Sequence, residues 1–163
     1  MAEHLEHAAQ LFEYQLGSAL RIETDARALC TEFASLAQDA ELTGLFTELR
    51  HVAGEQIDGL GQAFGALGVN PVVGTAATQG IVDEVESLIE LTSGPVIDAV
   101  MLSAALSTMR LATAAYDSLI IAASSLGATD VEELMRANLA RAQASAQRLE
   151  DAARGFGPFV ATV

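Results

Sequence analysis

Residues 98–125 read DAVMLSAALSTMRLATAAYDSLIIAASS, the longest apolar stretch of this 163-residue chain. Its apolar residues do not follow the strict alternation of a strand, and a run of this length and composition is typical of one long helix packed among others. Pro95 suits the first position of that helix, and Gly127 is a suitable residue to end it. The stretch holds no Glu and no His, and its only acidic residues are Asp98 and Asp117. The segment that indicates a helical bundle thus offers few side chains that could bind a metal ion.

Two long helical segments precede it. The first, from about residue 3 to residue 37, repeats apolar residues at helical spacing over its whole length, although Gly17 could weaken or break it. The second begins after Asp39, which is a plausible N-cap, and runs to about residue 67. Gly68 and Pro71 then end it, because glycine favours a helix stop and proline cannot continue a helix.

A shorter helix and a final long helix complete the chain. The shorter one is expected from about residue 75 to residue 91, before the break at residues 93–95. The final helix is expected from residue 131 to about residue 154, after a capping box formed by Thr129 and Glu132.

These elements predict an all-α fold in one domain covering residues 1–163. Four long helices with one short helix between the second and third of them indicate a ferritin-like four-helix bundle with a crossover helix. Residues 1–15 are expected to form a helical N-terminal extension. Residues 156–163, FGPFVATV, are expected to form an apolar tail that docks on the bundle or on a neighbouring molecule.

The charge of the chain limits its partners. It has 22 acidic residues against 8 basic ones, all of them Arg, for a net charge of −14. Such a chain repels phosphate backbones and anionic lipid, so nucleic acid and membrane surfaces are not expected partners. No apolar run long enough to span a membrane is free of polar breaks, and the N-terminus lacks the basic region of a secretory signal. The single cysteine, Cys30, cannot form an internal disulfide, which favours a cytoplasmic location.

Short motifs in the same order resemble the YciF-type ferritin-like proteins. They cover about residues 16–153 and include Glu41-Leu42, Gln56-Ile57, Leu67-Gly68, residues 77–81 (ATQGI), Asp98-Ala99, Ala114-Ala115-Tyr116 and Leu126-Gly127. The resemblance implies a bundle related to di-iron carboxylate proteins, a tendency to dimerise and an association with bacterial stress responses.

The resemblance also implies where metal ligands would lie. The ligand of the first helix falls on Glu23, or on Glu13 if the register is shifted. The ligand positions of the other three long helices fall on side chains that do not bind metal, namely Val52, Met109, Ala112 and Ala142. Since a di-iron site needs about six ligands, four of them carboxylates, the sequence predicts a bundle without a metal cofactor.

Several alternatives remain open from the residues alone. A residual metal site, either di-iron or di-manganese or mononuclear, could bind iron, manganese or zinc through Glu23, Glu48 and His51. A small apolar ligand could occupy a core cavity lined by Met101, Ala105, Met109, Ala112 and Tyr116. The positive charge of Arg110 or Arg141 could replace the metal and pair with Glu23, although pairing with surface acids is the favoured interpretation. The preferred function is non-catalytic: association as a homodimer or with a protein partner, through the apolar residues of the N-terminal helix and the tail.

Overall fold

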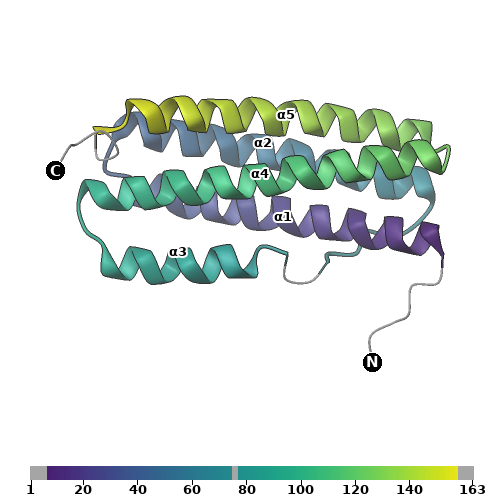
Figure 1. Ribbon diagram of the computed structural model, residues 1–163, viewed down its shortest axis with the longest axis horizontal. Coiled ribbons are helices and arrows are strands. Elements are labelled where there is room, and N and C mark those ends of the chain that lie inside the picture. Colours follow the sequence, from purple (N-terminus) through teal and green to yellow (C-terminus); the bar gives the residue numbers. More distant parts are fainter. Residues whose placement is uncertain (1–6, 75–76, 158–163) are drawn as a thin grey trace.

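The computed structural model describes residues 7–74 and 77–157, and every regular element in these ranges is a helix. The five helices are α1 (Ala8–Leu36), α2 (Ala40–Leu67), α3 (Gln79–Leu91), α4 (Pro95–Ser125) and α5 (Thr129–Gly155). Four of them are long, and α3 is the short one between α2 and α4 (Figure 1). The all-α bundle with a crossover helix that the sequence predicts is therefore confirmed.

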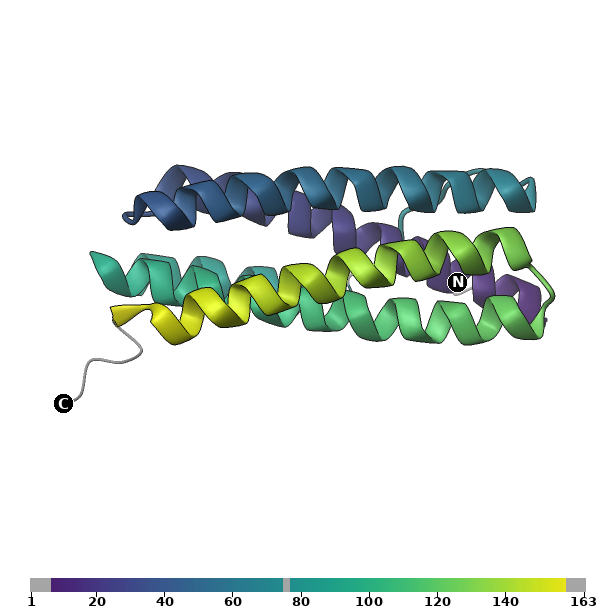
Figure 2. The same cartoon turned by 90° about the horizontal axis from the view of Figure 1, so that it is seen from above.

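The long helices pack as two hairpins. α1 packs against α2 and α4 packs against α5, while contacts between α1 and α4 and between α2 and α5 close the bundle. Figures 1 and 2 show that each long helix runs antiparallel to the two long helices beside it. The chain leaves α2 at one end of the bundle and must enter α4 at the other end. Residues 68–74, residues 77–78 and α3 lie along the outside on this return, with α3 packed mainly on α4.

Helix ends follow the expected chemistry in most places. Asp39 caps α2 by accepting hydrogen bonds from the backbone N–H groups of Glu41 and Leu42. Gly68 ends α2 with a φ of 70°, a left-handed conformation that glycine adopts without a steric cost. Pro95 is the first residue of α4, as expected.

Two predicted helix starts were wrong. α5 begins at Thr129 with Ala128 as its N-cap and without a side-chain cap, so Thr129 and Glu132 do not form the expected capping box. The tight turn at Gly127, with a φ of 68°, lets the helix start two residues earlier than predicted. α3 begins at Gln79 rather than near residue 75, because residues 77–78 form a turn. The residues before His7 lie outside the described part of the chain.

Gly17 does not break α1. It is instead the position at which another segment of the chain contacts the helix backbone. The backbone of residues 72–74 crosses α1 there, and Gly74 N–H donates to the Gly17 carbonyl at 2.7 Å. A Cβ atom on Gly17 would lie 2.6 Å from the carbonyl oxygen of Val72. The absence of a side chain therefore allows the return segment to lie directly on the helix.

The core is continuous along α4. Within residues 7–74 and 77–157, α4 is the one helix long and apolar enough to cross a membrane, with a mean hydropathy of 1.4. Its buried side chains pack against α1, α5 and α3, which is the position of a central bundle helix. Phe12 and Leu16 from the start of α1 are buried in the same core, so residues 8–15 continue α1 within the bundle.

Candidate functional site

Four buried polar side chains, one from each long helix, form a layer across the bundle. They are Glu23 on α1, Gln56 on α2, Tyr116 on α4 and Asn138 on α5, and none is more than 1% exposed. The Tyr116 hydroxyl donates to Oε1 of Glu23 at 2.8 Å, and Asn138 Nδ2 reaches the Tyr116 oxygen at 3.3 Å. We refer to these four residues as the polar layer.

Asn138 and Gln56 join α5 to α2. Asn138 Nδ2 donates to the Gln56 carbonyl at 3.0 Å, and Gln56 Nε2 donates to the Asn138 carbonyl at 3.3 Å. The pair fits because α2 carries Gly59 opposite Asn138, where a Cβ would lie 2.8 Å from Asn138 Oδ1. Gly59 thus allows α2 and α5 to approach closely at the polar layer. These reciprocal bonds satisfy amide groups that would otherwise be costly to bury.

Glu23 is the one incompletely satisfied member of the layer. Its Oε2 atom is buried and has no hydrogen-bond partner among the described residues. Burial raises the pKa of Glu23 to about 7, and the hydrogen bond from Tyr116 opposes that rise only in part. Glu23 is therefore mostly uncharged in mildly acidic conditions and partly ionised at neutral pH.

Glu23 also affects its neighbours. The pKa of the Cys30 thiol rises to about 12, first because it is buried and second because of the negative charge of Glu23. The pKa of Tyr116 is raised by burial and by the same charge. A thiol held in its neutral form is a poor nucleophile, and Cys30 is buried in an apolar cluster, so it serves as a small apolar core residue.

The structure distinguishes the two registers proposed for α1. Glu13 is exposed, whereas Glu23 faces the centre of the bundle. On α2 the aligned position is less buried than two of its neighbours. Val52 is only half-buried, and the inward positions are Ala53 and Gln56. The other aligned positions, Met109, Ala112 and Ala142, are buried as expected.

The proposed cavity residues belong to two apolar clusters of the core. Met101, Ala105 and Met109 belong to the apolar cluster at one end of the bundle. Ala112 and Tyr116 belong to the cluster at the other end, and Tyr116 directs its hydroxyl to Glu23. The five residues therefore contribute to separate parts of a packed core.

The candidate mononuclear site is not assembled. Glu48 pairs with Arg148 on the surface, and the His51 side chain is 83% exposed with Nε2 3.9 Å from a Glu55 carboxylate oxygen. Glu23 is in the core, so the three side chains face different environments. Within the described ranges no three His, Cys, Asp or Glu side chains are grouped as metal ligands.

The two arginines bind surface acids, as the favoured interpretation expected. Arg110 pairs with Glu150 at 2.6 Å, and Arg141 pairs with Glu55 at 3.2 Å. Arg141 also reaches Asn138 Oδ1 with NH1 at 3.4 Å, so it touches the outer edge of the polar layer. Neither guanidinium forms an ion pair with Glu23.

The polar layer does not fit a di-iron centre. The unpartnered Oε2 of Glu23 could accept a hydrogen bond or contact a cation, but the other members supply two neutral amides and a phenol. Two hard cations need several carboxylates to neutralise and bridge them. One carboxyl that is itself half-protonated at neutral pH cannot do so.

Sequence reasoning missed Asn138, and it used Gln56 only as part of a resemblance. Both are polar residues at inward positions of otherwise apolar helical stripes. An amide at such a position implies a buried hydrogen-bond partner on another helix. This pattern is the sequence signal by which both residues could have been recognised. The partner of each amide could not be named, because the relative rotation of two helices is not encoded in either one alone.

Comparisons with known proteins agree with this architecture. The crystal structure of the E. coli stress protein YciF is similar with a TM-score of 0.87 and 20% sequence identity, covering 94% of this chain and 99% of that one. YcfI from Rhodopseudomonas palustris, for which a structural role has been suggested, is similar with a TM-score of 0.86 and 22% identity, covering 92% and 97%. No curated protein matches the chain. The family described as "Domain of unknown function (DUF892)" matches residues 7–157. The chain is therefore a member of the DUF892 family, within a YciF-like group of helical bundles.

Proposed function

We propose that this protein is a ferritin-like bundle that works without a metal and acts by association rather than by catalysis. The observation that carries the proposal is the polar layer, in which neutral hydrogen-bonding groups occupy the centre of the bundle around a single carboxyl. Its groups bond to one another across four helices, which is a structural use of buried polarity. Catalysis would need a site open to a substrate, and these four side chains are enclosed.

The solved relatives support this proposal in a general way. One is described as a stress protein and the other by a suggested structural role. We propose a similar stress-related, non-catalytic role for this chain in the cytoplasm. The single cysteine, buried and unpaired, suits a reducing compartment.

The association proposed first is a homodimer. The apolar stripe expected to mediate it is not available, because Phe12 and Leu16 are buried within the bundle. Phe156, the first residue of the tail, packs partly against the bundle's own core, and residues 158–163 lie outside the described chain.

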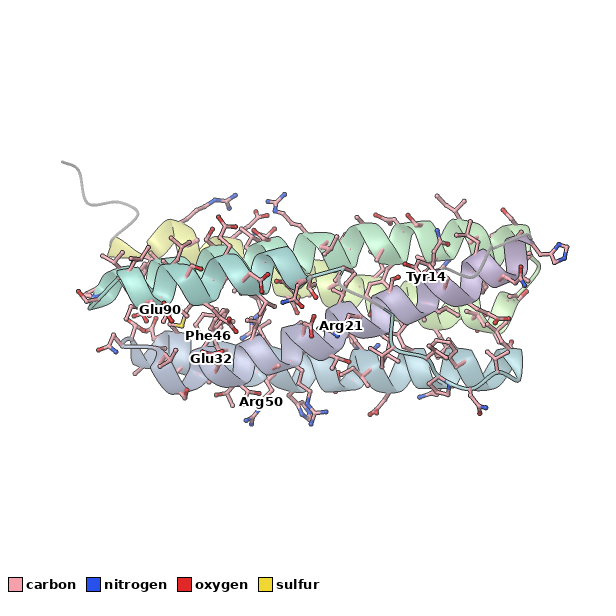
Figure 3. All side chains as sticks on the ribbon, turned by 90° about the horizontal axis from the view of Figure 1, so that it is seen from below. Tyr14, Arg21, Glu32, Phe46, Arg50 and Glu90 are labelled. Carbon is pink, nitrogen blue, oxygen red and sulfur yellow. The ribbon has the colours of Figure 1, made fainter. Side chains whose placement is uncertain are left out.

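Another apolar surface is exposed beside Gly17. Tyr14 on α1, labelled in Figure 3, is 51% exposed. Val72 and Val73 on the return segment are 65% and 50% exposed. The backbone contact at Gly17, one helical turn after Tyr14, holds the two parts together. We assign the dimer interface to these three residues, which we call the Tyr14 face, since exposed apolar groups of this kind usually mark contacts.

Two measurements test the proposal. Metal analysis of protein purified from iron- and manganese-supplemented medium is expected to show far less than one ion per chain. Two bound ions per chain would overturn the metal-free assignment.

Light scattering at micromolar concentration is expected to give the dimer mass, and Val72→Asp is expected to shift it to the monomer mass. Leu126→Asp, at an exposed apolar residue at the C-cap of α4, is the matched control and should leave the dimer intact. A monomer mass for the unmodified protein would count against association as a homodimer.

A further inference from the structure

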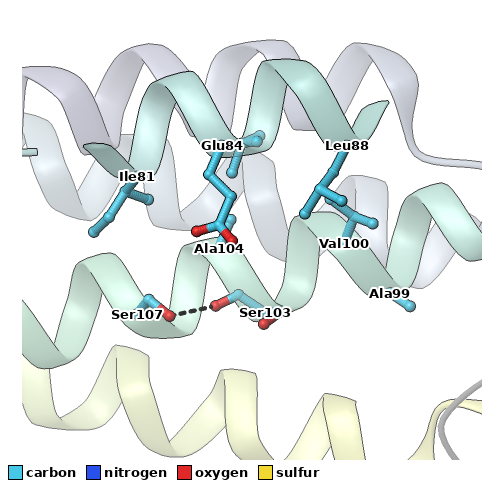
Figure 4. A pocket seen from close by; sticks show the side chains of 9 residues that line it. Ile81, Glu84, Leu88, Ala99, Val100, Ser103, Ala104 and Ser107 are labelled. Atoms are coloured by element: carbon cyan, nitrogen blue, oxygen red, sulfur yellow. Dashed lines mark hydrogen bonds between the residues drawn. The ribbon is translucent and has the colours of Figure 1, made fainter. Parts of the chain in front are cut away.

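A groove about 300 Å³ in volume lies between α3 and α4, outside the polar layer. Ile81 and Leu88 of α3 line one side, and Glu84 between them extends its carboxylate over the groove (Figure 4). On α4 the lining includes Ala99, Ser103 and Ser107, which follow one another at intervals of four residues. Residues spaced in this way share one face of a helix, so the floor is a strip of small side chains.

The groove exists because α3 is attached to the bundle along only part of its surface. Val85 is the one buried side chain within α3, and it enters the core cluster that contains Met101. Leu88 remains 39% exposed and Leu91 81% exposed beyond it. An apolar edge is thus left uncovered beside a floor whose small residues would allow another helix to approach closely.

The charge around the groove has one sign. α3 carries Asp83, Glu84, Glu86 and Glu90 and no basic residue. No Arg or Lys occurs anywhere between Arg50 and Arg110 in the sequence. Among the described residues none of these four carboxylates forms a salt bridge with an Arg, although Asp83 accepts a hydrogen bond from Gln79.

The negative charge and the small volume of the groove favour some classes of binding partner over others. A second copy placed on the same face would bring two sets of α3 carboxylates together without a compensating base, which is unfavourable. An anionic membrane surface would be repelled for the same reason. The volume is at the lower limit of ligand pockets, so it suits a few side chains of a protein better than a whole small molecule.

We propose that this groove docks a basic amphipathic helix of another protein. Apolar side chains of that helix lie against Ile81 and Leu88, and small residues meet the strip on α4. Its Lys or Arg side chains pair with Glu84 and the neighbouring acids of α3. The proposal rests on the function by association proposed above, and it adds a partner chemistry and a surface distinct from the Tyr14 face.

The test uses a fluorescent synthetic peptide of about four helical turns, with Leu on one face, Arg and Lys on the other and Ala between them. Binding to the full-length protein is measured by fluorescence anisotropy at low and high salt. We expect Glu84→Lys and Leu88→Asp each to weaken binding by about tenfold, because one reverses the central charge and the other places a charge on the apolar wall. High salt should weaken binding of the unmodified protein, since the charges are exposed.

Matched controls separate docking from general attraction to an acidic protein. Glu133→Lys makes the same charge change at an exposed position on α5 and is expected to change affinity less than twofold. Circular dichroism should show unchanged helicity in all three variants, because each position is exposed. A peptide with its basic residues replaced by Glu should not bind detectably.

Four results would overturn the proposal. Equal weakening by Glu84→Lys and Glu133→Lys would mean that net charge alone attracts the peptide. If the peptide with Glu in place of its basic residues bound as tightly as the basic peptide, the carboxylates of α3 would have no role in binding. A change of light-scattering mass in Leu88→Asp would mean that a second copy fills the groove. Failure of peptide binding in a protein that is dimeric and metal-free would reject this groove while leaving the proposed function standing.

Discussion

The hydroxyl of Tyr116 donates a hydrogen bond to Oε1 of Glu23 at 2.8 Å, while Oε2 of the same carboxyl is buried without a partner. A single bond therefore holds an acid whose charged form would normally require several. The neutral form is favoured in the folded chain, and the stability of the protein is linked to the protonation of this one group.

Stability should fall as pH rises through neutrality. The folded-state pKa of Glu23 is about 7, above its usual value of 4.5. Between these values the folded protein holds a proton that the unfolded chain has released, so the free energy of unfolding decreases until pH passes about 7. The stabilisation is fully present below about pH 4.5, and the loss amounts to about 3 kcal/mol. Urea denaturation of Glu23→Gln should show the variant close to the parent near pH 4.5 and more stable by up to that amount at pH 8. A constant difference between the two proteins at all pH values would contradict this linkage.

Tyr116→Phe should destabilise the bundle by about 1–3 kcal/mol, because Glu23 loses its donor and Asn138 loses an acceptor in a buried position. The effect should be larger at pH 8 than at pH 5, since the ionised carboxylate needs the donor more. Thermal unfolding at both pH values measures it. Combining the change with Glu23→Gln gives a double-mutant cycle, and a coupling energy near zero would mean that the two side chains do not interact.

Gly17→Ala should destabilise the protein by about 1–3 kcal/mol despite the better helix propensity of alanine. The new Cβ would lie 2.6 Å from the Val72 carbonyl, and backbone cannot rotate away as a side chain can. Gly54→Ala on α2 is the matched control, because no atom lies within 4 Å of its Cβ position. That variant should gain about 0.5–1 kcal/mol. Calorimetric melting of both proteins tests the pair, and equal shifts of the two would refute the close approach at Gly17.

Asp98→Ala should loosen the turn between α1 and α2. The buried Asp98 carboxylate accepts hydrogen bonds from the backbone N–H groups of Gln38 and Asp39 at 2.9 and 3.0 Å. Removing it leaves both donors unsatisfied at a cost of about 1–3 kcal/mol. Amide hydrogen exchange should accelerate at these two residues. Asp117→Ala, at an exposed position on the same helix, should leave their exchange rates unchanged.

The helices were largely predictable from sequence because their signals are local. Asp39, Gly68 and Pro95 mark ends by the geometry of a few neighbouring residues. The start of α5 was mispredicted because the sequence pattern of a capping box is present there without the backbone geometry that the box needs. Thr129 and Glu132 match a capping box in pattern, but the turn conformation at Gly127 and Ala128 starts the helix before the threonine can act as its cap.

The candidate site was predictable only in part. Glu23 was one of two carboxyls, with Glu13, that the resemblance matched to the ligand position of the first helix, and it is the one that lies in the core. The resemblance placed the ligand position of α2 at Val52, which is half-buried, whereas Gln56, about one turn further along, is fully buried. The groove beside α3 had no sequence signal of its own, since it is formed by two separate helices.

Sequence by itself determined the helical class, the number and approximate limits of the helices, and the strongly negative net charge. Periodicity, capping and composition act over a few residues and are therefore readable in a single chain. Only the tertiary structure decided which of these residues meet. The bond between Tyr116 and Glu23 joins residues 93 positions apart, and the amide pair of Gln56 and Asn138 joins residues 82 positions apart. Such contacts depend on how each helix is rotated and shifted against its neighbours, which is set by the packing of all four long helices together.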